Sequence, residues 1–101
     1  MAKFVVLFQD NEDFAHQRAK HMDKHLGFLE EHSLAINAAG PLTDSQNGAG
    51  AGGMWLVDVD SLEDVAELIQ RDPFWPTGLR KSFQILSWQQ VFCDGQRQPI
   101  R

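Results

Sequence analysis

The chain has 101 residues, of which 43% are hydrophobic and 23% charged, and this balance predicts one globular domain over residues 1–101. Its 14 acidic residues outnumber its 9 basic ones, which argues against nucleic acid or an anionic membrane as a partner, since both require a basic surface. The lone Cys93 leaves no intrachain disulfide, and no stretch approaches the roughly 20 apolar residues of a membrane span. We therefore expect a cytoplasmic protein.

The first third of the chain predicts a strand followed by a long helix. The apolar run Phe4–Phe8 indicates a strand buried on both faces. The helix is expected to be capped by Asp10 or Asn11 and to end near His32. An apolar stripe expected to pack on the sheet is formed by Ala15, Ala19, Met22, Leu26 and Leu29. The residues expected along one flank of this stripe are Arg18, His21, His25 and His32.

The middle of the chain predicts two strands joined by a loop. Leu34–Ala39 indicates the second strand, which leads into Gly40–Pro41. The glycine-rich segment Thr43–Gly53 has the composition of a hairpin loop or a flexible flap. A strand, Met54–Val59, follows it, whereas a phosphate-binding glycine loop must open a helix. A nucleotide site is therefore not expected here.

The last third predicts a helix from Ser61 to Arg71, a strand over Phe83–Phe92, and a loose polar tail from about Asp94. The face of this helix expected to be buried consists of Leu62, Val65, Leu68 and Ile69. The order of elements is βαββαβ, which is an α+β, ferredoxin-like split βαβ fold with two helices on one face of an antiparallel sheet. Because its strands are apolar on both faces, we expect a second copy to cover the other face in a homodimer.

Asp72 lies where the second helix must stop, because Pro73 cannot continue a helix. A carboxylate at this end meets the partial negative charge of the helix, so we expect it to seek a cation or a proton elsewhere. Asp followed by Pro is also typical of a type I turn, in which the Asp side chain binds a backbone amide two residues on. Both interpretations remain open at this point.

Several segments resemble the YciI-like (YCII-related) family over nearly the whole chain. They are His25–Leu29, Ala39–Leu42, Ser61–Glu63 with Asp72–Gly78, and Ser87–Phe92. The resemblance implies a dimeric α/β-barrel of ferredoxin-like subunits, with a site around a histidine and an aspartate that fall on His25 and Asp72. It also implies that some relatives are small-molecule enzymes, including a dehydrochlorinase that acts on a chlorinated hydroxyquinol.

The chain departs from this family pattern at two positions. Gly53 stands where many relatives carry a serine at the start of the third strand. Met22 stands where many carry an arginine three residues before the site histidine. If those residues bind substrate in the relatives, the substrate of this chain differs.

A histidine paired with a carboxylate can act as a general base without any cofactor, because the carboxylate fixes the imidazole tautomer and stabilises the imidazolium. The first hypothesis is a cofactor-independent lyase- or isomerase-like enzyme acting on a small compound such as a phenol. His25 would be its general acid/base and Asp72 the orienting partner. The alternative is a non-catalytic ligand-binding or dimerisation module. The two helices of this fold run antiparallel, so the end of the second helix lies near the start of the first, whereas His25 is expected in the latter half of the first. Contact between His25 and Asp72 therefore requires that the first helix starts late or that the Asp-Pro turn folds back.

Other residues carry weaker signals. His21 and His25 have the spacing of a metal-binding pair, but residue 22 is methionine where a zinc protease needs glutamate, and no metal is expected. Cys93 has no basic cluster nearby in sequence, which argues against a reactive thiolate. Four aromatic residues are expected to make core or dimer contacts, and one or two of them could wall a pocket for a flat ligand. They are Trp55, Phe74, Trp75 and Trp88.

Overall fold

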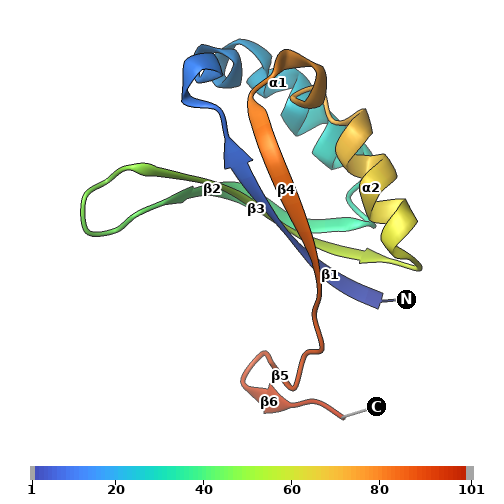
Figure 1. The fold of residues 1–101 in the computed structure, drawn as a ribbon. Helices are drawn as coiled ribbons and strands as arrows, with labels where there is room; N and C mark the ends of the chain where they lie inside the picture. Colours follow the sequence, from blue (N-terminus) through green and yellow to red (C-terminus); the bar gives the residue numbers. More distant parts are fainter. Residues whose placement is uncertain (1, 100–101) are drawn as a thin grey trace.

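The computed structural model describes residues 2–99 as a four-stranded antiparallel sheet with two helices on one of its faces (Figure 1). The sheet order is β2-β3-β1-β4, and a separate two-stranded hairpin, β5-β6, follows. The elements in chain order are β1 (Ala2–Asp10), the 3-10 helix η1 (Glu12–Phe14), α1 (His16–Glu31), β2 (Ile36–Thr43), β3 (Gly50–Val59), α2 (Leu62–Arg71), the 3-10 helix η2 (Trp75–Thr77), β4 (Arg80–Ser87), β5 (Phe92–Cys93) and β6 (Gln96–Arg97). The predicted βαββαβ, ferredoxin-like fold is confirmed.

The core lies between the sheet and the helices. Side chains alternate along a strand, so Phe4, Val6 and Phe8 of β1 point into the core while the intervening residues point to the other face. Trp55 and Val57 of β3 join them from the neighbouring strand. The contributions of the helices are Phe28 from α1 and Val65, Leu68 and Ile69 from α2. Leu62, predicted to be buried with this group, is exposed at the first position of α2.

The first helix starts later than predicted. β1 continues to Asp10, and Asn11 caps the short helix η1 by accepting a hydrogen bond from the Asp13 amide. α1 then begins at His16. The prediction failed because the acidic residues typical of a helix start belong to η1, which precedes α1.

The buried face of α1 also differs from the predicted apolar stripe. The two buried residues of the helix are His25 and Phe28, whereas Ala19 is exposed and Leu26 is 46% exposed. The most buried side of the helix is therefore shifted from the predicted stripe toward its flank at His25, although Leu29 of the stripe still packs against the core. Phe28 explains this choice, because its large ring packs near Trp55, with ring centroids 6.3 Å apart, and alanines offer much less apolar area.

The predicted boundaries of the second and third strands shift. β2 runs through Gly40 and Pro41 to Thr43, and β3 already begins at Gly50, so the predicted Thr43–Gly53 loop shortens to residues 44–49. The hairpin they form extends well beyond the other strands (Figure 1). Backbone pairing between β2 and β3 carries the glycines into the sheet in spite of their low strand propensity.

At the C-terminal end, β4 ends at Ser87 where a strand to Phe92 was predicted. Phe92 and Cys93 pair with Gln96 and Arg97 in a small hairpin, so the expectation of a loose tail from Asp94 is wrong for these residues. The hairpin lies apart from the main sheet (Figure 1). The end of the predicted tail, residues 100–101, lies outside the described residues.

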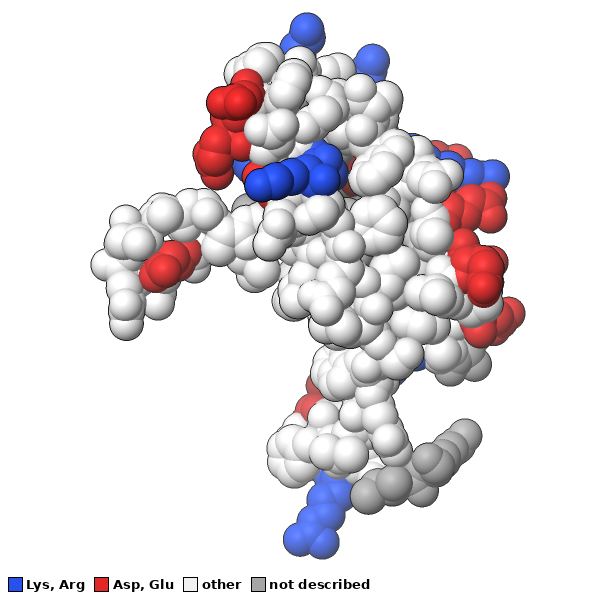
Figure 2. All heavy atoms as spheres, in the orientation of Figure 1, with Lys and Arg blue, Asp and Glu red and all other residues white. Residues whose placement is uncertain are grey.

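The surface reflects the acidic composition. Figure 2 shows acidic side chains gathered over α2, where Glu63, Asp64 and Glu67 lie. Across residues 2–99, no helix is long and apolar enough to cross a membrane.

Candidate active site

His25 and Asp72, the two predicted site residues, are in direct contact. His25 Nδ1 lies 2.8 Å from Asp72 Oδ1, and the two side chains are only 9% and 3% exposed. His25 comes from the middle of α1 and Asp72 follows the last residue of α2. α1 starts late, at His16, which is one of the two conditions that the sequence set for a contact between the two residues.

The Asp-Pro turn orients the carboxylate. The backbone at Asp72 is extended, with φ −62° and ψ 130°, so the helix stops there as the following proline requires. Asp72 Oδ1 accepts a second hydrogen bond, from the Phe74 amide, at 3.1 Å. The turn interpretation and the pair interpretation are therefore both correct, and the turn is what holds the carboxylate against His25.

The hydrogen bond with Asp72 determines which nitrogen of His25 can accept a proton. An ionised carboxylate only accepts hydrogen bonds, so Nδ1 of His25 must be the donor. In the neutral ring, Nε2 then carries the free lone pair. The Phe74 ring stacks on the imidazole, with centroids 4.1 Å apart and planes inclined by 16°, and this contact fixes the plane of the ring.

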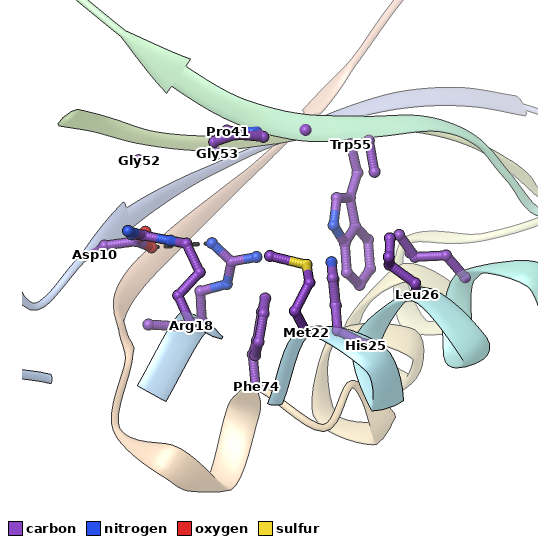
Figure 3. Close-up of a pocket in the computed structure, with 14 residues that line it drawn as sticks. Asp10, Arg18, Met22, His25, Leu26, Pro41, Gly52, Gly53, Trp55 and Phe74 are labelled. Atoms are coloured by element: carbon purple, nitrogen blue, oxygen red, sulfur yellow. Dashed lines mark hydrogen bonds and ion pairs between the residues drawn. The ribbon is translucent and has the colours of Figure 1, made fainter. Parts of the chain in front are cut away.

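His25 lines a pocket of about 120 Å³ between α1 and the sheet. Trp55 and Phe74 form aromatic walls, and Pro41 and Gly53 close it from the β2-β3 hairpin. Figure 3 shows His25 and Trp55 on one side of this pocket and Asp10 with Arg18 on the other, with Met22 and Phe74 between them. The expectation that one or two aromatic residues wall a pocket fits Trp55 and Phe74, whereas Trp75 is half-buried and Trp88 is exposed.

A charged cluster at the far side of the pocket was not foreseen from the sequence. Arg18 Nη2 donates to Asp10 Oδ2 at 2.6 Å, and Arg80 Nη1 donates to Asp10 Oδ1 at 2.9 Å. Asp10 was interpreted as a helix cap and Arg80 had no assigned role. The two residues meet because β1 and β4 pair with Asp10 opposite Arg80. Only the strand register could have revealed this, since 70 residues separate them in sequence.

Both departures from the family pattern line this pocket. Met22 projects into it from α1, and Gly53 forms part of its wall on β3. A Cβ atom at Gly53 would lie 3.1 Å from Arg80 Nη1. Because residue 53 has no side chain, the space next to the Arg80 guanidinium stays open.

The remaining candidates stay apart from the site. His16 is exposed, and His32 packs against Phe28 with ring centroids 4.6 Å apart. Cys93 is a free thiol in the distant β5-β6 hairpin. Among residues 2–99, no three His, Cys, Asp or Glu side chains gather as a metal-binding group.

Comparison with known proteins places the chain in a family. A model of the YCII-related domain matches residues 2–89. The chain belongs to the YCII-related family. No curated protein sequence matches it.

Solved structures similar to this YCII-related protein agree with its fold. The 5-chloro-2-hydroxyhydroquinone dehydrochlorinase TftG from Burkholderia phenoliruptrix, in complex with 2,5-dihydroxybenzoquinone, matches with a TM-score of 0.75 and 22% identity over 86% of this chain and 93% of its own. A protein from Agrobacterium tumefaciens matches with a TM-score of 0.53 and 15% identity over 88% and 92% of the two chains. A hypothetical protein from Arabidopsis thaliana matches with a TM-score of 0.52 and 15% sequence identity, over 92% of this chain and 90% of its own. At these identities the likeness shows the fold alone, which is the ferredoxin-like βαββαβ arrangement.

Proposed function

We propose that this YCII-related protein is a cofactor-independent enzyme of the lyase or isomerase type, acting by proton transfer on a small, flat compound. The observation that carries the proposal is the 2.8 Å contact between His25 Nδ1 and the buried Asp72 carboxylate, in a pair whose histidine lines a pocket. His25 is the general acid/base, and Asp72 orients the ring and stabilises its charged form.

The reaction begins at Nε2 of His25, which takes a proton from a phenol oxygen or from a carbon next to a carbonyl group. The electron pair of the broken bond remains on the substrate. In an isomerase the imidazolium returns the proton to a different atom. In a lyase acting on a chlorinated hydroquinone, the imidazolium first returns the proton to the ring carbon that carries chlorine. His25 then takes a proton from a second hydroxyl group, the electron pair left on that oxygen forms a carbonyl group and shifts a ring double bond, and chloride leaves from the protonated carbon. The imidazolium finally loses its proton to water.

A flat ring fits the walls and the size of the pocket. Trp55 and Phe74 offer aromatic faces, and such faces favour stacked or edge-on rings. The volume of about 120 Å³ is similar to the roughly 150 Å³ of an apolar cavity that binds benzene. The name and the bound quinone of the dehydrochlorinase TftG support the same class of substrate for this chain.

The burial of His25 favours a second candidate, a ligand-binding module without catalysis. Its ring is packed between Phe74 and Asp72, as in a pair that only stabilises the contact between the two helices. This candidate predicts that a ligand binds in the pocket and that no turnover of it occurs.

We also propose that the protein is a homodimer whose subunits pack through the sheet face opposite the helices. Three adjacent strands of that face, β1, β3 and β4, carry a group of apolar side chains, which are Val5, Leu7, Met54, Leu56 and Leu86. A contiguous apolar patch exposed to water favours association with another surface.

Turnover of hydroxylated aromatics, including 5-chloro-2-hydroxyhydroquinone, tests the catalytic role. His25→Ala should lower kcat by about 10²–10⁴-fold, the usual contribution of a general base. The matched control is His16→Ala, which removes an exposed histidine from the same helix and should leave the rate unchanged. Equal rates in the wild type and His25→Ala would refute the catalytic proposal.

A further inference from the structure

We propose that Arg80, assisted by Arg18, is an oxyanion-recognition subsite of this pocket, and that the ligand is a small flat ring carrying a phenolate, enolate or carboxylate group. The inference rests on the proposed function only in that it uses the same pocket. It specifies the charge of the ligand and the residues that select it.

The cluster carries an excess of positive charge. Arg18 and Arg80 share the single carboxylate of Asp10, so the three side chains together have a net charge of +1. The side chains of Asp10 and Arg80 are 5% and 8% exposed, so water screens this charge poorly. A monoanion bound beside them would complete the charge balance of the site.

Arg80 also has unused hydrogen-bond donors. Its guanidinium carries five N–H groups, and the structure records one hydrogen bond from them, Nη1 to Asp10. Its Nε atom is buried and has no partner among the described residues. Buried donors are rarely left unpaired because the loss of water is costly, and Arg80 lines the pocket, so its unused donors point to a ligand acceptor.

The guanidinium is held in place by aromatic rings. Arg80 Cζ lies 4.2 Å from the centre of the Phe8 ring and 5.3 Å from that of Phe74. These contacts and the Asp10 hydrogen bond fix the direction of its donors before a ligand arrives. Such preorganisation reduces the cost of binding.

Phe74 connects this subsite with the proposed base. The same phenyl ring stacks on His25 and has Arg80 Cζ 5.3 Å from its centre, and both His25 and Arg80 line the pocket that would hold the ligand. When His25 removes a proton from the ring, negative charge grows on the oxygen that Arg80 holds. A fixed positive charge at that position stabilises the transition state more than the starting compound.

Calorimetric titration with benzoate and with benzamide tests the inference, because these two compounds have nearly the same shape and differ in charge. The wild type should bind benzoate at least about tenfold more tightly than benzamide. Arg80→Met should abolish this preference while leaving benzamide affinity within about twofold. Arg97→Met, which removes a positive charge from the distant β6 strand, is the matched control and should keep the preference.

Arg18→Met provides a second variant in case the loss of Arg80 prevents folding, since Arg18 is partly exposed and its removal still lowers the charge of the subsite. It should reduce the preference for benzoate. Equal affinity of the wild type for both compounds, no benzoate binding at millimolar concentration, or a preference unchanged in the arginine variants that fold would each overturn the inference.

The outcome of the benzoate and benzamide titrations is independent of the turnover assay with His25→Ala. A charge preference that depends on Arg80, together with equal turnover by wild type and His25→Ala, would support the subsite and refute the catalytic proposal. Loss of turnover in His25→Ala without any charge preference would do the reverse.

Discussion

The imidazole of His25 stacks on the ring of Phe74, which follows by two residues the aspartate that His25 binds. One short turn therefore supplies a carboxylate to the edge of the imidazole and an aromatic ring to its face. The Phe74 amide also donates to the same carboxylate oxygen. The position of His25 thus depends on Asp72 and Phe74 together, and a substitution at either residue should also alter the contact that the other makes with His25.

Phe74→Leu removes the stacking partner of His25 and keeps an apolar side chain. Aromatic pairs contribute about 0.5–1.5 kcal/mol beyond the area they bury, so we expect the free energy of unfolding to fall by about 1–2 kcal/mol. Urea denaturation measures this change. Phe92→Leu is the control, because Phe92 is exposed on β5 and its replacement should stay within about 0.5 kcal/mol. Equal effects of the two changes would show that the contact with His25 contributes nothing.

Asp72→Asn tests the carboxylate separately from the shape of the turn. The asparagine oxygen can still accept the Phe74 amide hydrogen bond, so the protein should fold with a loss of about 1–2 kcal/mol. A neutral amide cannot stabilise the imidazolium, and kcat should fall roughly 10²–10⁴-fold with little change in KM. Steady-state kinetics distinguish the two effects. A fall in stability with unchanged kcat would leave Asp72 a purely structural role.

The sequence and the family resemblance pointed to His25 and Asp72 but left open whether the two residues touch, and they did not reveal the residues around them. The helix stop at Pro73 and the family motif located Asp72 and His25, because both signals are local in the chain. The role of Arg80 depends on which residue of β1 it faces, and that register is set by long-range pairing. The face of α1 was misjudged for a similar reason, since only the sheet opposite the helix decides whether Leu26 or His25 points inward.

The glycines of the β2-β3 hairpin provide a test of the observed register. Gly52 and Gly48 both have positive φ, 84° and 73°, so alanine is strained by about 1–2 kcal/mol at either position. At Gly52 a Cβ would also overlap the Phe8 carbonyl oxygen, whereas at Gly48 the space is open. Gly52→Ala should therefore lose a further ~1–3 kcal/mol of stability in thermal or urea unfolding. Equal losses would mean that β3 does not approach β1 as described.

The proposed dimer can be tested on the sheet face without helices. Leu56 lies near the middle of this face, opposite Val5 on β1, and Leu56→Glu would place a charge among apolar side chains. Burying an unpaired charge in an interface costs several kcal/mol, so light scattering should show a dimer for the wild type and a monomer for this variant.

Leu34→Glu is the matched control for this change. Leu34 is 92% exposed in the turn between α1 and β2, so the same substitution there should leave the dimer intact. Its side chain is also outside the core, which separates a specific effect on association from a general effect of added charge. A wild-type protein that is monomeric at micromolar concentration would contradict the dimer, and the apolar face would then need another partner to cover it.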